Sequence, residues 1–272
     1  MAERGESGGS GSGKGSGNGS GTGLPASIEA AWGLRERPSK GPRPGLSLGR
    51  IVDAAVGLAA EEGLAAVSMG RVAKVLGVST MSLYRYVAAK DELYVLMQEA
   101  VIGTPPPTRQ GEGWRTALAA WAWAQREVFH RNLWALRVPV SGPPATPNMV
   151  AWWEQGMVAL ESTGLDDGQK ISVIVLVGGF VRSEAMMMSD IGAAVAASGG
   201  EEEFLARHVN TLTRLADPQR YPAVARLLGS GVLTQPDEPD HEFTFGLDRI
   251  LDGVAVLIAT QEGGREGSAD PR

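Results

Sequence analysis

The stretch that decides the fold is residues 67–93, VSMGRVAKVLGVSTMSLYRYVAAKDEL, which predicts two short helices joined by a tight turn. Ser68 is a favourable N-cap for the first helix, in which apolar side chains recur with the i, i+3, i+4 spacing of one buried stripe. Gly77 ends this helix, because glycine enters the left-handed conformation without a steric penalty from a Cβ atom. The predicted inward stripe consists of Val72, Val75 and Leu76.

The second helix is predicted over residues 80–87, with Ser79 as its N-cap and with Leu83 and Val87 facing inward. Its outer face carries side chains that can recognise bases and phosphates in a major groove of DNA. Hydroxyl groups and a guanidinium read base edges, a methionine contacts a thymine methyl group, and tyrosines reach phosphate oxygens. We therefore expect DNA contacts from Ser79, Thr80, Met81, Ser82, Tyr84, Arg85 and Tyr86.

The helix-turn-helix sequence closely resembles the DNA-binding head of TetR-type transcriptional regulators. The resemblance is strong over residues 47–103 and rests on architecture alone elsewhere. It implies an all-α protein, in which a three-helix head with a helix-turn-helix precedes a larger helical domain that dimerises and usually holds an inducer. It also implies a phosphate contact for Lys90. The residues that carry the resemblance are Leu76, Gly77, Val78, Ser79, Leu83, Tyr84, Tyr86, Val87 and Lys90.

Two departures from that family's pattern change the expected DNA contacts. Gly70 stands where many relatives have a larger polar side chain, and Arg71 either replaces that contact or faces solvent. Arg85 occupies a position that is often aromatic, which predicts a different base preference. Ser47, the expected N-cap of the first head helix, and Ser68 complete the set of expected DNA contacts.

Charge is distributed unevenly along this chain of 272 residues, whose formal net charge is −6. Residues 32–90 carry nine basic and four acidic side chains, whereas residues 91–272 carry 14 basic and 24 acidic side chains. A positive head on a negative body lets one end of the protein approach a polyanion. The acidic composition of the whole chain is therefore compatible with DNA binding.

Composition divides the chain into five predicted segments. A Gly- and Ser-rich tail over residues 1–27, either native or a cloning linker, is expected to be disordered, because it buries too little apolar surface to offset the entropy of ordering. The basic arm over residues 28–46 comes next. It is followed by the head over 47–103, the helical domain over 104–260 and a second disordered tail over 261–272.

The basic arm has two interpretations. Prolines keep it extended, so it is either a solvated linker or an arm that enters the minor groove beside the head. We favour the second interpretation, since arginine side chains suit a narrow minor groove. The groups that would enter the groove are Arg35, Arg37, Lys40 and Arg43.

The last helix of the body is expected to mediate dimerisation. Its apolar stripe, within residues 245–259, is too broad for a surface helix and requires another helix to pack against. By resemblance, this helix and the one around residues 171–188 form a four-helix dimer interface, whose two-fold symmetry predicts a palindromic operator. The expected interface residues are Leu247, Ile250, Leu251, Val254 and Leu257.

Six tryptophans between residues 114 and 153, together with several methionines, predict a large apolar cavity for a small molecule in the body. Core packing and dimer contacts are the alternative explanation for these side chains. Two charged groups in the apolar helix, Arg182 and Glu184, either pair with neighbours or orient polar atoms of the ligand, because burying them unpaired is costly. The expected ligand-binding residues are Trp121, Gln125, Phe129, Trp134, Trp153, Met157, Arg182 and Met186.

Several classes of function are disfavoured by the sequence. The chain has no cysteine and three widely spaced histidines, so we expect no disulfide framework, no bound metal and no other cofactor. We also expect no membrane span and no signal segment, which fits a cytoplasmic protein. No nucleophile motif, phosphate-binding glycine loop or acid/base pair indicates an enzyme.

The leading prediction for function is a homodimeric repressor that binds a palindromic operator in double-stranded DNA. A small hydrophobic effector in the body would release it by favouring a geometry in which the heads no longer fit the groove spacing. The alternatives are an architectural or activating DNA-binding protein without an inducer and, third, an enzyme with a helical body.

Overall fold

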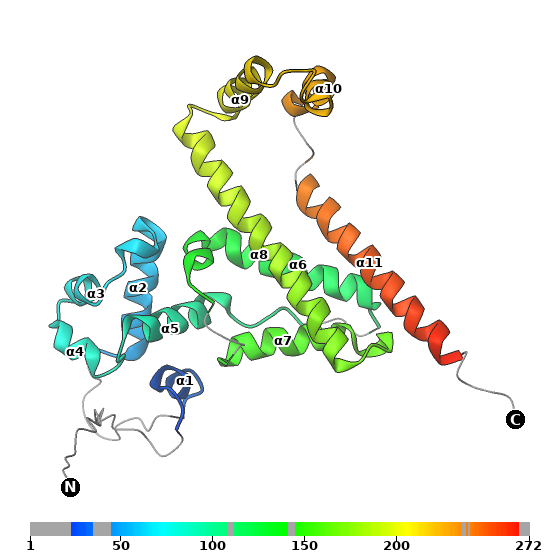
Figure 1. Cartoon of the computed structure of the whole chain (residues 1–272). Helices are drawn as coiled ribbons and strands as arrows, with labels where there is room; N and C mark the ends of the chain where they lie inside the picture. Colours follow the sequence, from blue (N-terminus) through cyan, green and yellow to red (C-terminus); the bar gives the residue numbers. More distant parts are fainter. Residues whose placement is uncertain are drawn as a thin grey trace, which may run out of the picture.

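The computed structural model describes residues 23–34, 45–107, 111–140, 145–235, 238 and 240–266. Within these ranges every regular element is a helix, which confirms the predicted all-α fold (Figure 1). A small head contains α2 to α5, and a larger body contains α6 to α11. The α-helices are α1 (Ala26–Ala31), α2 (Leu48–Glu62), α3 (Met69–Leu76), α4 (Thr80–Tyr84), α5 (Lys90–Ile102), α6 (Trp114–Arg131), α7 (Pro147–Ala159), α8 (Asp167–Ala197), α9 (Glu201–Leu215), α10 (Pro222–Ser230) and α11 (His241–Glu266). The short 3-10 helices are η1 (Leu64–Ala66), η2 (Leu133–Arg137), η3 (Glu161–Thr163) and η4 (Val232–Thr234).

Local signals in the sequence set the ends of the head helices. The Ser47 hydroxyl accepts a hydrogen bond from the Arg50 amide at 3.3 Å, and the Ser68 hydroxyl accepts one from the Arg71 amide at 3.3 Å. Both serines are therefore the predicted N-caps, of α2 and α3 respectively. Gly77 ends α3 with a φ of 67°, in the left-handed region that glycine enters without strain.

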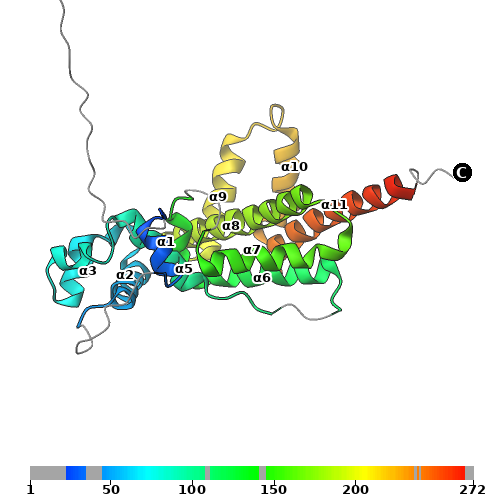
Figure 2. The ribbon, with the colours of Figure 1, turned by 90° about the horizontal axis from the view of Figure 1, so that it is seen from below.

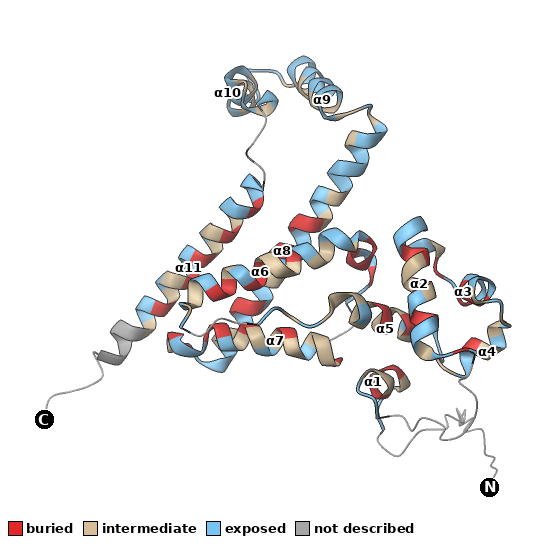
Figure 3. Cartoon of the chain, turned by 180° about the vertical axis from the view of Figure 1, so that it is seen from behind, coloured by how far each residue is buried: buried red, intermediate tan, exposed pale blue. Residues whose placement is uncertain are grey.

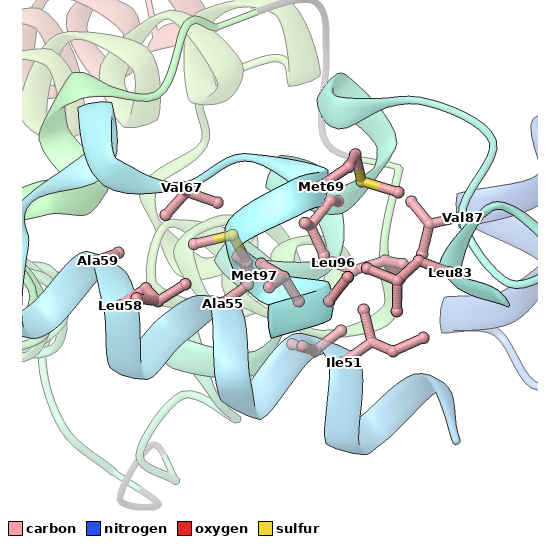
Figure 4. Close-up of a cluster of buried hydrophobic side chains, with 14 of the residues drawn as sticks. Ile51, Ala55, Leu58, Ala59, Val67, Met69, Leu83, Val87, Leu96 and Met97 are labelled. Carbon is pink, nitrogen blue, oxygen red and sulfur yellow. The ribbon is translucent and has the colours of Figure 1, made fainter. Parts of the chain in front are cut away.

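The head contains one hydrophobic core, to which α2, α3, α4 and α5 all contribute (Figure 4) and which Trp134, Ala135 and Val138 of the body complete. Fully burying one large apolar side chain contributes about 1.5–3 kcal/mol, so this core holds α3 and α4 in fixed positions on their supporting helices. The largest fully buried side chains of the head include Ile51, Leu83, Leu93 and Met97.

The stripe predicted for α3 is wrong in one position. Val72 is fully buried and Leu76 is half-buried, but Val75 is 58% exposed. Met69 and Ala73 join Val72 in the buried stripe, which shifts the centre of the stripe away from Val75 around the helix. Val75 therefore adds an apolar side chain to the outer surface of the head.

The second helix of the motif is shorter than predicted. α4 ends at Tyr84 instead of continuing to Val87. The chain tightens into a turn there, in which the Tyr86 amide donates to the Leu83 carbonyl at 2.8 Å. Leu83 and Val87 are nevertheless fully buried, as predicted, and they anchor this turn in the head core.

The body has a second hydrophobic core between α6, α7, α8 and α11. α8 begins with a capping box, in which the Asp166 carboxylate accepts from the Gln169 amide at 2.8 Å and the Gln169 side chain accepts from the Asp166 amide at 3.1 Å. Gly246 allows α11 to approach α8 closely, since a Cβ atom at this position would lie 2.6 Å from the Phe180 ring. The two helices are therefore fixed against each other along this part of the body.

The pair formed by α9 and α10 stands apart from the body core. The chain leaves the end of α8, passes through α9 and α10, and returns to the start of α11, so the pair projects from the body (Figures 1 and 3). No residue of α9 or α10 is buried, and Leu215 is 74% exposed. Figure 2 shows the same projection from below, with α6, α7, α8 and α11 grouped beneath it.

The ends of the chain differ from the predicted boundaries where the structure describes them. α1 begins at Ala26, inside the tail predicted over residues 1–27, and Trp32 Nε1 donates to the Ala145 carbonyl at 2.8 Å. α11 continues to Glu266, inside the tail predicted over residues 261–272, because no helix-breaking proline occurs before the end of that helix. Residues 1–22 lie outside the described residues.

α8 is long and apolar enough to cross a membrane by length and composition alone, a test that the core helix of a helical bundle also passes. Only 33% of its most apolar stretch is buried within the protomer. Arg182 and Glu184 lie inside this helix, and both bond to neighbouring elements of the bundle. Such charged groups at mid-helix are costly in a bilayer and are accommodated here by protein partners.

Candidate nucleic-acid interface

The outer face of the helix-turn-helix presents most of the predicted DNA-binding side chains to solvent. Met81 is 73% exposed, which leaves its thioether free to touch a base. The Ser79 and Ser82 hydroxyl groups lie 2.9 Å apart and share a hydrogen bond, which orients both at the start of α4. The exposed members of the set are Ser79, Met81, Tyr84 and Arg85, and the half-buried members are Thr80 and Ser82.

Arg71 is held by an acidic neighbour. Its two terminal nitrogens donate to the two carboxylate oxygens of Glu62, the last residue of α2, at 2.8 and 2.5 Å. This pair of hydrogen bonds is the main reason that the pKa of Arg71 is raised and the pKa of Glu62 is lowered. A phosphate contact by Arg71 therefore requires the guanidinium to leave or share Glu62.

Tyr86 and Lys90 have different positions in the head. The Tyr86 hydroxyl donates to the Leu46 carbonyl at 3.0 Å and its ring packs on the head core, so this tyrosine positions the chain before α2 instead of pointing to phosphate. Lys90 opens α5, as predicted, and its ammonium group lies 5.1 Å from the centre of the Tyr94 ring. Because Lys90 is exposed, its charge remains accessible to a phosphate.

The remaining predicted DNA contacts are two serines and the basic arm. Ser47 and Ser68 are exposed while they cap their helices, and each hydroxyl retains a proton that it can donate to phosphate. The side chains of the predicted minor-groove arm lie outside the described residues, so their contacts stay predictions. They are Arg35, Arg37, Lys40 and Arg43.

The predicted dimer residues of α11 fall into two groups. Leu247 and Leu251 are buried in the protomer's own core and are not available to a second copy. Ile250 and Leu257 are half-buried, and together with the buried Val254 they line an open groove of about 650 Å³ between α8 and α11. The broad stripe on α11 therefore serves two purposes, because one edge packs inside the protomer and the other edge remains at the surface.

The predicted ligand-binding residues are spread over the body and beyond it. Trp134 packs in the head core. Met186 lines an exposed hollow of about 480 Å³ beside Phe204 of α9. Arg182 donates to the backbone carbonyls of Leu136 and Val138. These three positions do not line one cavity, because Trp134 packs in the head core, Met186 lies beside α9 and Arg182 is bound to backbone carbonyls.

The other predicted ligand residues belong to α6 and α7 of the body. Trp121 Nε1 donates to the Trp152 carbonyl at 2.9 Å, and the two indole rings meet edge to face with centroids 6.4 Å apart. Trp121 also lines a hollow of about 290 Å³ beside Gln155 and residues 106–107 of the linker before α6. Gln125, Phe129, Trp153 and Met157 are half-buried, and a ligand role for them stays a prediction.

A buried charge cluster in the body was missed by the sequence reasoning. Arg126 is only 8% exposed, and its guanidinium donates to the buried Glu184 at 3.2 Å and pairs with Asp240 at 2.8 Å. Burial opposes the charged form of Arg126, but the hydrogen bonds to both carboxylates outweigh it, so the pKa of Arg126 is raised. The available signal was its position four residues after Ala122, on the inward stripe of α6.

A helix-turn-helix with an exposed polar face, held on a compact helical support and followed by a larger helical body, defines a DNA-binding regulator. Two family models match the chain and together include both parts. The model of bacterial regulatory proteins of the tetR family matches residues 51–97, and the model of the tetracyclin repressor-like C-terminal domain matches residues 106–258.

Named relatives indicate the same family. The chain is 38% identical over 261 residues to the HTH-type transcriptional repressor DrrR1 of Streptomyces coeruleorubidus, covering 95% of each chain. It is 30% identical over 204 residues to an HTH-type transcriptional regulator of Saccharopolyspora erythraea, covering 72% of this chain and 80% of that protein. The chain therefore belongs to the TetR family of transcriptional regulators, and it is a repressor of that family and not an enzyme.

Solved structures share this arrangement of helices. Apo ActR from Streptomyces coelicolor superposes with a TM-score of 0.66 at 27% identity, covering 82% of this chain and 100% of that chain. ActR in complex with actinorhodin also gives a TM-score of 0.66 at 27% identity, covering 78% and 98% of the two chains. ActR, which resembles this protein in fold, thus binds a small molecule.

Proposed function

We propose that two copies of this chain associate through α8 and α11, bind a palindromic operator with their two heads, and release it when a small hydrophobic molecule binds the body. The observation that carries this proposal is the open apolar groove between α8 and α11. A two-fold axis beside that groove would present two copies of the α3–α4 face to one DNA duplex. The site of action is then the cytoplasm, where the operator lies.

Exposed apolar side chains along α8 support the dimer. Leu176 is 53% exposed, and Val175 and Met187 are exposed on the same helix. Apolar surface left in water is unfavourable by about 25 cal/mol per Å², and contiguous patches of this kind mark association sites. Ile250 and Leu257 of α11 extend the surface on the other side of the groove. A second copy that presents the same two helices would cover all of these groups.

Control by a small molecule is supported by a relative and by the composition of the body. ActR, which is 27% identical to this chain, has been solved with (S)-DNPA and with actinorhodin. In this chain, Trp121, Phe129 and Met157 place aromatic and thioether surfaces between α6, α7 and α8. A ligand that binds one arrangement of the body more tightly shifts the population toward it and changes how the heads are spaced.

The dimer and the operator are tested together by selecting DNA from a random pool with the purified full chain. We expect the selected sequences to contain an inverted repeat, and mass photometry of the complex to show two protein chains on each duplex. An asymmetric sequence occupied by one chain would contradict the proposal.

The effector is tested by thermal shift and operator titration across a screen of apolar and aromatic compounds, with actinorhodin as the first probe. We expect a ligand to raise the melting temperature and to weaken operator binding in the same concentration range. If every compound that stabilises the protein leaves operator affinity unchanged, or if none stabilises it, DNA binding without an inducer is favoured.

A further inference from the structure

The short helix η2 joins the body to the head at a point far from the covalent linker. It follows the end of α6, yet its side chains enter the hydrophobic core of the head instead of the body core. Trp134, Ala135 and the following Val138 are all buried there. η2 packs on α2 and η1 of the head and also on α6 and α8 of the body. Movement of η2 relative to the body would therefore move the head with it.

α8 holds η2 from the other side through polar contacts. The Arg182 guanidinium donates to the carbonyls of both Leu136 and Val138, the second at 3.1 Å, and lies 6.0 Å from the centre of the Phe129 ring. About two helical turns further along α8, Asp190 forms an ion pair with Arg137. Burial lowers the pKa of Arg182, because desolvation disfavours the charged guanidinium. These contacts hold the C-terminal end of η2, from Leu136 to Val138, against one helix.

One polar group of η2 is left without a hydrogen bond where the helix packs in the head. Trp134 Nε1 is buried and, within the described part of the chain, has no hydrogen-bond partner. An unpaired buried donor is unfavourable, so the polar contacts from α8 offset part of the cost of placing η2 in the head core.

We propose that η2 carries the position of α8 into the head, and that Arg182 is the positioning residue that sets the angle of the head and thereby the half-site spacing accepted by the dimer. The inference rests on the proposed function, because α8 also carries the proposed dimer face. In the proposed dimer, α8 lies at the two-fold axis and is bound to η2. This arrangement gives each head one orientation relative to the other. Arg182 is thus assigned to DNA binding from a distance, and not to the ligand as its sequence position suggested.

The test measures operator affinity as a function of half-site spacing. The operator selected by the wild-type chain is remade with its half-sites one and two base pairs closer together or further apart, and each step changes their separation by about 3.4 Å and their rotation by about 35°. The variants are Arg182→Gln, which removes the charge, and Arg182→Lys, which keeps the charge but not the planar fork that reaches two carbonyls. Arg207→Gln is the matched control, because Arg207 donates to the Ser198 carbonyl and to Glu203 far from the head.

We expect the wild type and Arg207→Gln to lose about tenfold in affinity for each wrong spacing, and Arg182→Gln to lose only about twofold, with a lower affinity at the native spacing. Arg182→Lys should fall between them. A merely structural role for Arg182 would lower affinity by the same factor at every spacing, and that result would overturn the proposal. If Arg182→Gln does not fold, as judged by circular dichroism, the comparison between Arg182→Lys, Asp190→Asn and wild type decides it.

The failure of this inference and the failure of the proposed function give different results. If the dimer is absent, the wild-type chain itself shows no dependence on half-site spacing, and the proposed function fails first. If the wild type depends steeply on spacing and both Arg182 variants keep the same profile, the dimer stands and η2 is not the coupling element.

Discussion

The head and the body of this repressor differ in how completely they bury their own apolar side chains. The head exposes three large apolar side chains, Val75, Met81 and Tyr84, and all three belong to the helix-turn-helix. The body exposes apolar side chains on α8, α9, α10 and α11, over faces that carry no predicted DNA contact. The head is thus complete as a single copy, whereas the body has surfaces that require another partner.

This difference indicates where each half of the function resides. A core that is closed within one copy of the chain keeps the DNA-reading groups in one geometry, because moving them would open well-packed apolar contacts. Incompletely covered helices can change partners or arrangement at lower cost. We therefore expect recognition of bases to depend on the head alone and control of that recognition to depend on the body.

The largest expected effect follows from opening the head core. Leu83→Ala removes a fully buried side chain from α4, and the cavity that remains should lower the free energy of unfolding by about 2–5 kcal/mol. Operator binding should be lost while the body stays helical, as measured by urea unfolding and DNA titration. Leu118→Ala, in the body core, should be similarly destabilising and should leave the head folded. A single shared unfolding transition in both variants would show that the two cores are not independent.

A charge on the exposed face of α8 should have the next largest effect. Leu176→Glu places a carboxylate in the groove between α8 and α11, where a second copy could not cover it without desolvating the charge. We expect a monomer by light scattering and a loss of operator affinity of about 100-fold, because the two heads no longer bind together. Val140→Glu is the control, since Val140 is also apolar and is even more exposed, but lies outside both helices. A dimer that survives Leu176→Glu would place the interface elsewhere.

A smaller effect is expected from releasing Arg71. Glu62→Gln removes the carboxylate that holds the guanidinium, so Arg71 becomes free to contact phosphate. Operator affinity should rise at low salt, and the slope of log affinity against log salt should steepen by about 0.9, the value for one added phosphate contact. The corresponding change in the body, Glu127→Gln, breaks the pair with Arg131 and should leave the slope unchanged. An unaltered slope in Glu62→Gln would show that Arg71 faces solvent in the complex.

The smallest expected effect is a pH dependence in the body. Hydrogen bonds from Arg249 and then from Arg115 lower the pKa of Asp252. A lowered pKa means that its contribution to stability is present above the ordinary carboxyl range and is lost as the pH falls through the lowered value. We expect Asp252→Asn to reduce the melting temperature slightly at pH 7 and to lose less on further acidification. Equal acid sensitivity in the variant and the wild type would remove Asp252 from the acid response.

The predictions from sequence were most successful where the deciding contacts lie within one or two helical turns. Ser47 and Ser68 cap their helices and Gly77 ends α3, because each acts on backbone groups only a few residues away. They were least successful for side chains with distant partners. Trp134 lies in the head core and not in a body cavity, because η2 doubles back from α6 to the head. Sequence periodicity carries no information on that path.

By itself, the sequence determined the all-α fold and the helix-turn-helix with its outer polar face, because caps, glycine and apolar periodicity are local physical signals. The order of residues in the motif also carried the resemblance to the family. Only the tertiary structure decided which of those polar groups are free. It paired Arg71 with Glu62, turned the Tyr86 hydroxyl toward Leu46 and brought Arg182 to the carbonyls of η2. In each case the partner is brought near by packing of helices, and the energy of such a contact depends on a geometry that no local pattern specifies.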